Sequence, residues 1–313
     1  MIEHNKKDED KTFWLIVPPE SPCGCGSGKA FGDCHLKDGN VKLTSKNINP
    51  PMPLTGQSIK KCYFAFTNNC GGGISREHII SRAVLSKIND KQIDFTRDGV
   101  TRTYALDSSS LTTKRLCRRH NSAINPIDYQ AGRFIETVSH AQNIVLSKAK
   151  TNQRLYLFEG FDLERWLLKT LLNVYYSRLS VDPQKFVLPS NLESYFFNQL
   201  KPPFGLYIPF QLDNEARYKM QIAPKAEFNL ITESNLVCGL MVSLAGLEMK
   251  FIVAGHPQTL GKFTSQHAYR PEYINFLQEG EVISIATVWV QKSANALWLL
   301  PSPEALPPQG ILE

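Results

Sequence analysis

The sequence has no apolar run long enough to cross a membrane. A transmembrane helix needs roughly 18 or more consecutive apolar residues, and no stretch of the chain approaches that length. Residues 1–12 mix lysines with acidic residues and lack the apolar centre of a secretory signal. We therefore expect a cytoplasmic protein.

A disulfide framework of the secreted type is also missing. Of the seven cysteines, three lie within residues 23–34 and three flank the dipeptide Glu77-His78. Such clusters in a cytosolic chain favour metal sites over disulfides. Cys238 stands alone between apolar residues, so we interpret it as a buried, inert thiol.

A phosphate-binding loop is excluded at residues 27–29, although they read Ser-Gly-Lys. The Walker A pattern needs a glycine where Cys23 stands and a serine or threonine where Ala30 stands. The same stretch instead supplies four zinc ligands. Three thiolates and one imidazole suit a tetrahedral zinc ion, and the ligands are Cys23, Cys25, Cys34 and His35.

The stretch 22–35 resembles the SEC-C motif, a small zinc-binding module that accompanies other domains in many bacterial proteins. The resemblance implies a structural zinc ion. It also implies a contact with a protein partner or with nucleic acid, without indicating which.

Two segments further along the chain belong together. Residues 75–81 read Ser-Arg-Glu-His-Ile-Ile-Ser, and residues 116–121 read Leu-Cys-Arg-Arg-His-Asn. They resemble the HNH (ββα-metal) nucleases, in the variant with asparagine in place of the last histidine. The resemblance implies that Glu77 and Asn121 hold a catalytic Mg²⁺ or Mn²⁺ ion, while His78 activates a water molecule. A role in antiviral defence or in a mobile element follows from the resemblance alone.

The resemblance also implies a second structural zinc site. Its four ligands would be Cys62, Cys70, Cys117 and His120. Cys62 and Cys70 are further apart than the usual pair, so one of them is alternatively a simple core residue. Many HNH motifs carry a central asparagine, and residues 111–116 contain none.

Positive charge is concentrated around these motifs. Residues 58–150 contain fifteen Lys and Arg against seven Asp and Glu, whereas the whole chain carries +6. A basic segment suits a phosphate backbone, although a solvated basic surface is the alternative. The expected nucleic-acid contacts are Arg76, Lys114, Arg115, Arg118 and Arg119.

The expected fold class is α+β, in four parts. They are a zinc knuckle with its N-terminal arm (1–45), a linker (46–57), a ββα-metal HNH domain (58–150) and an α+β domain with antiparallel strands (151–313). Periodicity predicts helices over 128–150 and 162–178, with Asp162 as N-cap of the second. Alternation predicts strands over 218–222, 247–251 and 283–289. The insertion 89–110 is either a hairpin that contacts DNA or a loop.

The last part offers no ligand cluster. We interpret His256 and His267 as surface-loop residues, and residues 301–313 as a poorly ordered tail. The leading functional expectation is a metal-dependent DNA endonuclease. The alternatives are a catalytically silent zinc protein that binds nucleic acid or a protein partner, and an RNA nuclease.

Overall fold

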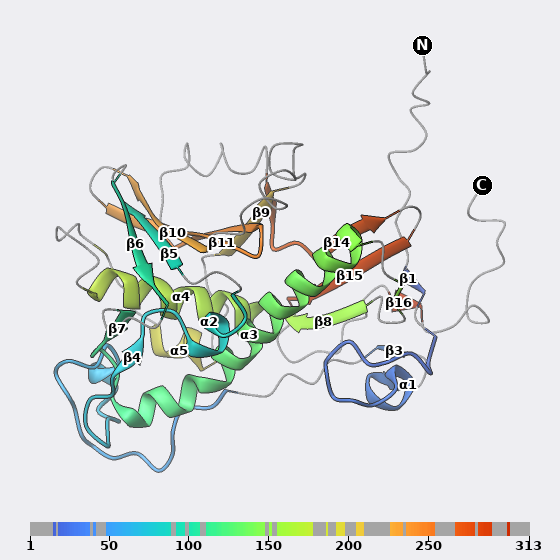
Figure 1. Cartoon of the computed structure of the whole chain (residues 1–313). Coiled ribbons are helices and arrows are strands. Elements are labelled where there is room, and N and C mark those ends of the chain that lie inside the picture. Colours follow the sequence, from blue (N-terminus) through green and yellow to red (C-terminus); the bar gives the residue numbers. More distant parts are fainter. Residues whose placement is uncertain are drawn as a thin grey trace.

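The computed structural model describes the chain in segments, which cover residues 15–16, 18–37, 40–41, 48–88, 92–97, 100–106, 111–147, 150–151, 155–177, 186, 192–197, 205–209, 226–233, 236–253, 267–278, 281–289 and 299–300. Within them the fold is mixed α+β, as the sequence predicts. A large sheet lies on one side of two long helices, and a smaller sheet lies beside the C-terminal part of the first helix (Figure 1).

The larger sheet has seven strands in the order β13-β9-β12-β11-β10-β5-β6. The strands are β5 (Gln92–Arg97), β6 (Val100–Ala105), β9 (Gly205–Pro209), β10 (Ala226–Glu233), β11 (Leu236–Leu244), β12 (Leu247–Ile252) and β13 (His267–Tyr269). Neighbouring strands are antiparallel except β10 and β5, which are parallel with Phe95 beside Phe228. Within the insertion 89–110, the described strands β5 and β6 pair in antiparallel fashion, and they extend a sheet made mostly by the C-terminal half.

The smaller sheet has three strands in the order β14-β15-β8. They are β8 (Leu155–Glu159), β14 (Tyr273–Gln278) and β15 (Glu281–Val288). The pair β14–β15 is antiparallel and the pair β15–β8 is parallel. The predicted strands 247–251 and 283–289 are confirmed, whereas 218–222 lies outside the described residues.

Two helices form the centre of the molecule. Helix α3 (Arg118–Ser147) crosses α4 (Gly160–Tyr176), and α4 lies between α3 and the larger sheet (Figure 1). Every residue of α4 from Gly160 to Val174 is buried, as expected for a helix that is apolar around most of its circumference. Trp166 on α4 and Phe134 on α3 are among the largest fully buried side chains.

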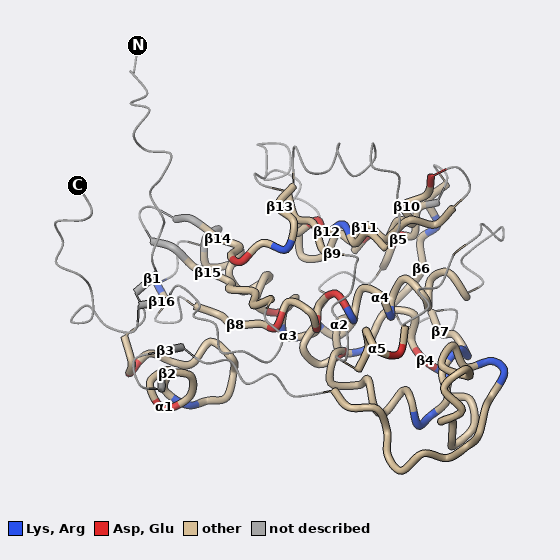
Figure 2. Tube along the Cα trace, turned by 180° about the vertical axis from the view of Figure 1, so that it is seen from behind, with Lys and Arg blue, Asp and Glu red and all other residues tan. Residues whose placement is uncertain are grey.

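The remaining elements are short. They are β1 (Leu15–Ile16), α1 (Phe31–Cys34), β2 (Leu36–Lys37), β3 (Asn40–Val41), η1 (Ala65–Thr67), β4 (Glu77–His78), α2 (Arg82–Leu85), β7 (Thr112–Thr113), α5 (Leu192–Phe196) and β16 (Leu299–Leu300). Strand β4 pairs with β7 in antiparallel fashion. The segment around α1 and the segment around β4 and β7 lie at opposite ends of the molecule (Figures 1 and 2).

The two helix starts differ from the prediction. Helix α3 begins at Arg118, ten residues before the predicted start, and it includes Pro126. Proline has no N–H for the helix and usually marks a boundary, but Pro126 lies inside α3. The N-cap of α4 is Glu159 and not Asp162. Asp162 lies in the first turn, where its carboxylate accepts a hydrogen bond from Arg165 at 2.5 Å.

The predicted linker is partly packed. Ile48 is buried in the main core, and the Asn69 side chain donates to the Pro51 carbonyl at 2.7 Å. The segment therefore packs against the structure around Cys70. One core cluster runs from Ile48 to Ile285 and includes residues on both sides of position 150. The predicted domain limits stay a prediction, but residues of both 58–150 and 151–313 belong to this core.

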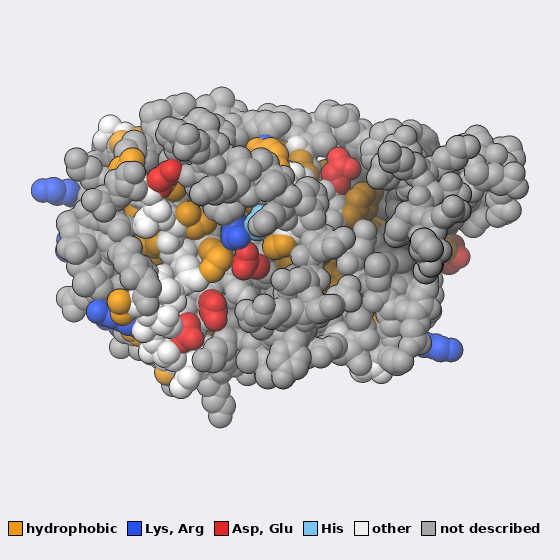
Figure 3. Space-filling model, turned by 90° about the horizontal axis from the view of Figure 1, so that it is seen from above, with side chains coloured by type: hydrophobic (Ala, Val, Ile, Leu, Met, Phe, Trp, Pro, Cys, Tyr) orange, Lys and Arg blue, Asp and Glu red, His pale blue; other side chains and the backbone are white. Residues whose placement is uncertain are grey.

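His267 is not a surface-loop residue. It lies on β13 and is 7% exposed, with its Nε2 atom 3.0 Å from the Lys250 ammonium. Glu248 approaches the same ammonium at 3.0 Å. Figure 3 shows acidic, basic and histidine side chains together on this face of the molecule. His256 and residues 301–313 lie outside the described residues.

Candidate functional site

The first Cys/His cluster is compact. The ligand atoms of Cys23, Cys25, Cys34 and His35 all lie within 4.8 Å of one another. The sulfur of Cys25 lies 3.4 Å from that of Cys23 and 3.6 Å from that of Cys34. A tetrahedral zinc ion with bonds of about 2.3 Å holds its sulfurs about 3.8 Å apart. The cluster therefore has the dimensions of a structural zinc site.

This cluster is attached to the smaller sheet through Gly24. The Gly24 carbonyl accepts a hydrogen bond from the Leu157 amide at 2.9 Å. A Cβ atom on Gly24 would lie 2.6 Å from the Leu155 carbonyl oxygen, so only glycine allows this approach.

The second cluster is fully buried. The ligand atoms of Cys62, Cys70, Cys117 and His120 again lie within 4.8 Å of one another. His120 presents its Nδ1 atom to all three sulfurs, at 3.6 Å from Cys62, 3.9 Å from Cys70 and 3.2 Å from Cys117. Both Cys62 and Cys70 belong to the cluster. The alternative in which one of them is a simple core residue is not favoured.

Burial makes the metal-free cluster electrostatically costly. It raises the pKa of the Cys62 thiol to about 12 and lowers the pKa of His120 to about 4. Thiolates at this depth need a cation among them, because an unpaired buried charge is strongly disfavoured. Zinc is the cation that the donor set fits.

We expect protein purified without added metal to contain two zinc ions per chain, one for each cluster. Elemental analysis measures this directly, and Cys25→Ser should lower the value to one. A wild-type value near one would eliminate one of the sites, and the Cys25→Ser result would identify which. A value near zero would contradict both.

The second cluster lies where the two sequence segments 75–81 and 116–121 come together. Ile74 pairs with Cys117, and the Ser75 amide and hydroxyl both donate to the Leu116 carbonyl at 2.8 Å. The Arg118 amide donates to the Gly73 carbonyl at 2.9 Å. Gly72 and Gly73 have φ values of 70° and 72°, which form the turn from Cys70 into this pairing. The segment before Glu77 therefore runs along the start of α3.

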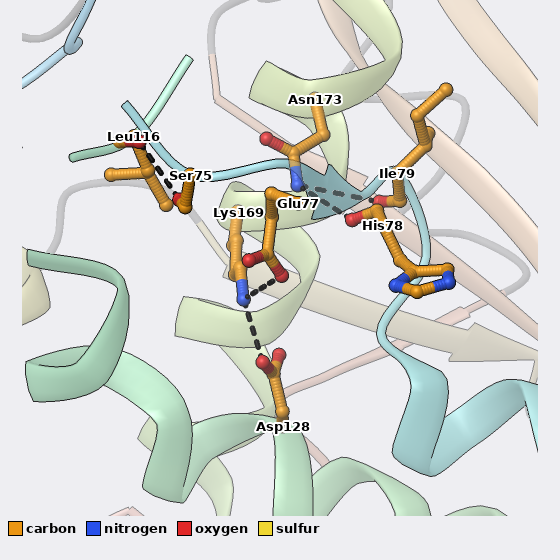
Figure 4. A network of polar contacts seen from close by, with 8 residues as sticks. All are labelled: Ser75, Glu77, His78, Ile79, Leu116, Asp128, Lys169 and Asn173. Carbon is orange, nitrogen blue, oxygen red and sulfur yellow. Dashed lines mark hydrogen bonds and ion pairs between the residues drawn. The ribbon is translucent and has the colours of Figure 1, made fainter. Parts of the chain in front are cut away.

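Glu77 and His78 point to different sides of β4 (Figure 4). Glu77 is 8% exposed and His78 is half-buried. Successive side chains of a strand point to opposite faces, and Arg76, on the other side of Glu77 from His78, is exposed. The backbone of β4 is held by α4, where the Asn173 amide donates to the His78 carbonyl at 3.2 Å.

Lys169 on α4 is the partner of Glu77. Its ammonium donates to Glu77 Oε1 at 2.8 Å and to Asp128 Oδ2 on α3 at 2.6 Å (Figure 4). Burial opposes the charge on Lys169, but the carboxylates of Asp128 and Glu77 outweigh it and raise the pKa of the ammonium. Within the described residues, the Glu77 carboxylate is paired with Lys169, and no hydrogen bond joins it to Asn121.

Asn121 lies in the first turn of α3, next to His120. Its amide donates to the Cys117 carbonyl at 2.9 Å, and its side chain is half-buried. Asp128 follows seven residues later on the same helix face, because seven residues make nearly two turns. This face of α3 thus carries Asn121, which the sequence predicts as a site residue, and Asp128, which it does not.

The basic residues divide into two groups. Arg76, Lys114 and Arg118 are exposed. Figure 2 shows basic residues gathered near β4 and β7. Arg115 stacks on the Tyr176 ring with its guanidinium carbon 4.8 Å from the ring centroid. Arg119 donates to Asn69 Oδ1 at 3.2 Å and to the Pro53 carbonyl. Arg115 and Arg119 therefore have intramolecular partners.

Sequence reasoning did not identify Asp128, Lys169 or Asn173 as part of a site. A signal existed for the last two. They are polar residues four apart on a helix that is otherwise apolar around most of its circumference, so both face one side. Asp128 ends the stretch 116–128, which resembles bacterial HNH proteins, but that resemblance assigned no role to its carboxylate.

Comparisons of the chain with protein-family models, with curated proteins and with solved structures gave no match. Among the helices that the structure describes, none combines the length and the apolar character that a membrane crossing needs.

Proposed function

We propose that this chain is a metal-dependent endonuclease of the HNH (ββα-metal) type that hydrolyses phosphodiester bonds of DNA. The observation that carries the proposal is the second Cys/His cluster. It fastens the segment that leads into Glu77 and His78 to the first turn of α3, which carries Asn121. A phosphodiesterase needs these three side chains on a rigid frame, and a zinc site supplies such a frame.

His78 is the general base in this proposal. A neutral imidazole at this position takes a proton from water, and the resulting hydroxide-like oxygen attacks the phosphorus. The ring extends from the face of β4 opposite to Lys169, so the Lys169 ammonium does not contact the ring nitrogens (Figure 4). The half-buried position leaves the ring accessible to substrate.

The donor set suits a hard divalent cation. The Glu77 carboxylate and the Asn121 amide carbonyl supply oxygen ligands of the kind that Mg²⁺ and Mn²⁺ prefer. When bound, the ion neutralises charge that develops on the phosphate and on its leaving oxygen. Glu77 is held in place for this role by its bond to Lys169.

Exposed basic side chains provide the affinity for nucleic acid. Arg76 adjoins Glu77 in the chain, and Lys114 and Arg118 adjoin the residues that pair with its segment. Contacts to phosphates release counterions, so we expect binding to weaken as salt rises. Such contacts do not read sequence, and we propose no sequence specificity from them.

Arg118→Ala should weaken DNA binding for every sequence and reduce the salt dependence by about one unit of slope, because it removes one phosphate contact. Its thermal stability should stay at the wild-type value, since Arg118 is exposed. Arg119→Ala is the matched comparison. It should lower thermal stability, because it breaks the bonds to Asn69 and Pro53. Salt titrations of a gel shift, with melting curves of both variants, measure these effects. An unchanged slope for Arg118→Ala would make this surface a solvated face.

The proposal is tested by cleavage of supercoiled plasmid with Mg²⁺ or Mn²⁺. We expect nicked and then linear DNA, and full suppression by a chelator at a concentration that leaves the zinc content unchanged. A parallel reaction with single-stranded and double-stranded RNA separates the DNA nuclease from the RNA nuclease. No cleavage of either nucleic acid with either ion would contradict the proposal.

One observation favours a second candidate function, a zinc protein that binds nucleic acid without cutting it. The Lys169 ammonium is already paired with Oε1 of Glu77, the carboxylate that would hold the catalytic ion. In that case the protein shifts DNA on a gel but leaves it intact with every divalent ion tested.

A further inference from the structure

Lys169 bridges two carboxylates that come from different elements. Glu77 lies on β4 and Asp128 on α3, and the ammonium of α4 lies 2.8 and 2.6 Å from their oxygens. All three side chains are almost completely buried, with Glu77 8%, Asp128 6% and Lys169 1% exposed. The Lys169 ammonium of α4 thus bridges strand β4 and helix α3 where the three elements meet (Figure 4).

The charges at this point do not balance. Two carboxylates face one ammonium, which leaves one negative charge when both acids are ionised. Burial raises the pKa of Asp128, and the neighbouring Lys169 offsets that only in part. Asp128 Oδ1 is buried and has no hydrogen-bond partner among the described residues. An ionised oxygen in this position is costly unless a donor or a cation reaches it.

We propose that Glu77 and Asp128 together bind a divalent cation, and that Lys169 is a tethered cation that holds the two carboxylates in place before the metal arrives. The inference rests on the proposed function in so far as Glu77 is a metal ligand there, and it adds Asp128 as a second carboxylate ligand. Carboxylates from separate elements suit Mg²⁺ or Mn²⁺, which retain several water ligands. A metal-bound water would supply the partner that Asp128 Oδ1 lacks.

The same geometry sets the sign of the effect of Lys169. Its positive charge lies within hydrogen-bond distance of both ligands, so it repels an incoming divalent ion while keeping its ligands in position. Removing that charge leaves two buried carboxylates with no counter-ion. They should then bind a divalent cation more tightly.

The test measures Mn²⁺ binding by the loss of the free-ion electron paramagnetic resonance signal, on the zinc-loaded full chain without nucleic acid. Asp128→Asn should weaken Mn²⁺ binding by about tenfold or more, and Lys169→Met should strengthen it by about tenfold. Glu136→Gln is the control, because Glu136 lies on the same helix but is exposed and paired with Lys87. Its Mn²⁺ affinity should equal that of the wild type. Zinc content and circular dichroism establish that each variant is folded, and Lys169→Gln replaces Lys169→Met if the latter does not fold.

Each outcome has a definite meaning. Asp128→Asn with wild-type Mn²⁺ affinity, beside a Glu77→Gln variant that no longer binds the ion, would overturn the inference and leave the proposed function standing. Weaker Mn²⁺ binding by the folded Lys169 variant would overturn the role of Lys169 as a competing cation. A wild-type protein that cuts DNA only with Mn²⁺ or Mg²⁺, together with weak binding by Asp128→Asn, supports both the function and the inference.

Discussion

Cys117→Ser is expected to empty the second zinc site and to destabilise the protein severely. Cys117 is fully buried, and its sulfur lies 3.2 Å from His120 Nδ1. Structural zinc contributes about 10–16 kcal/mol of binding free energy in zinc-finger peptides near neutral pH, and that energy is part of folding. Losing one of four ligands should cost about 4–5 kcal/mol or more of unfolding free energy. We expect a melting temperature lower by about 10 °C or more, since 1 kcal/mol corresponds to roughly 2–4 °C in larger domains.

The effect should extend beyond the cluster itself. Cys117 pairs with Ile74, and the neighbouring Arg118 amide bonds to Gly73, so the start of α3 should separate from the segment before Glu77. Melting curves and zinc analysis measure the change. Cys238→Ala is the matched control, because Cys238 is also a buried thiol but lies on β11 outside both clusters. It should retain two zinc ions. A Cys117→Ser protein with two zinc ions and an unchanged melting temperature would contradict the structural role of the site.

The first zinc site could be predicted because its four ligands, three cysteines and one histidine, lie within thirteen residues of sequence. The second set spans residues 62–120 and was implied by the resemblance to HNH proteins. The structure brings all eight predicted ligands into two compact groups. The buried helix α4 was equally visible, since its apolar residues cover most of the circumference. These features depend on residue type and spacing, which a sequence displays directly.

Features that depend on long-range pairing could not be predicted. The hairpin β5–β6 could be anticipated as an alternative, but its parallel pairing with β10 joins residues about 130 positions apart and leaves no local pattern. His267 reads as polar in its local sequence, and it is buried only because β13 pairs with β9. The early start of α3 has a similar cause, because pairing with the segment around Gly73 holds the first turn despite Pro126.

The partners of the candidate site were hidden for the same reason. Glu77, Asp128 and Lys169 come from three elements, and only the fold brings them together. A lysine in an apolar helix is a sign of a buried partner, because a buried ammonium must be paired. The sequence therefore contained the anomaly without the identity of its partner.

His78→Ala is expected to abolish cleavage while zinc content, fold and DNA binding stay nearly unchanged. A general base acts in the transition state and contributes little to binding of the ground state. Removing one typically costs on the order of 10²–10⁴ in rate. The side chain is half-buried, and the recorded contact with α4 is made by the backbone carbonyl of His78, which alanine retains.

Asn121→Ala distinguishes loss of the base from loss of a metal ligand. Activity of Asn121→Ala should recover in part at high Mn²⁺, because a weakened metal site can be filled by mass action. Activity of His78→Ala should not recover, since no metal concentration replaces the base. Glu77→Ala is a poorer comparison, because it leaves the buried ammonium of Lys169 with one partner fewer and should also destabilise the fold.

The role of His78 as general base is measured most directly by the initial rate of plasmid nicking by His78→Ala and wild-type protein at saturating Mn²⁺, with equal zinc content and equal DNA affinity. We predict that wild-type protein nicks the plasmid and that the variant is slower by about 10²–10⁴. A variant that nicks as fast as wild type would contradict the assignment of nuclease activity to this site. A variant that loses zinc or unfolds would contradict it too, because His78 would then be a structural residue.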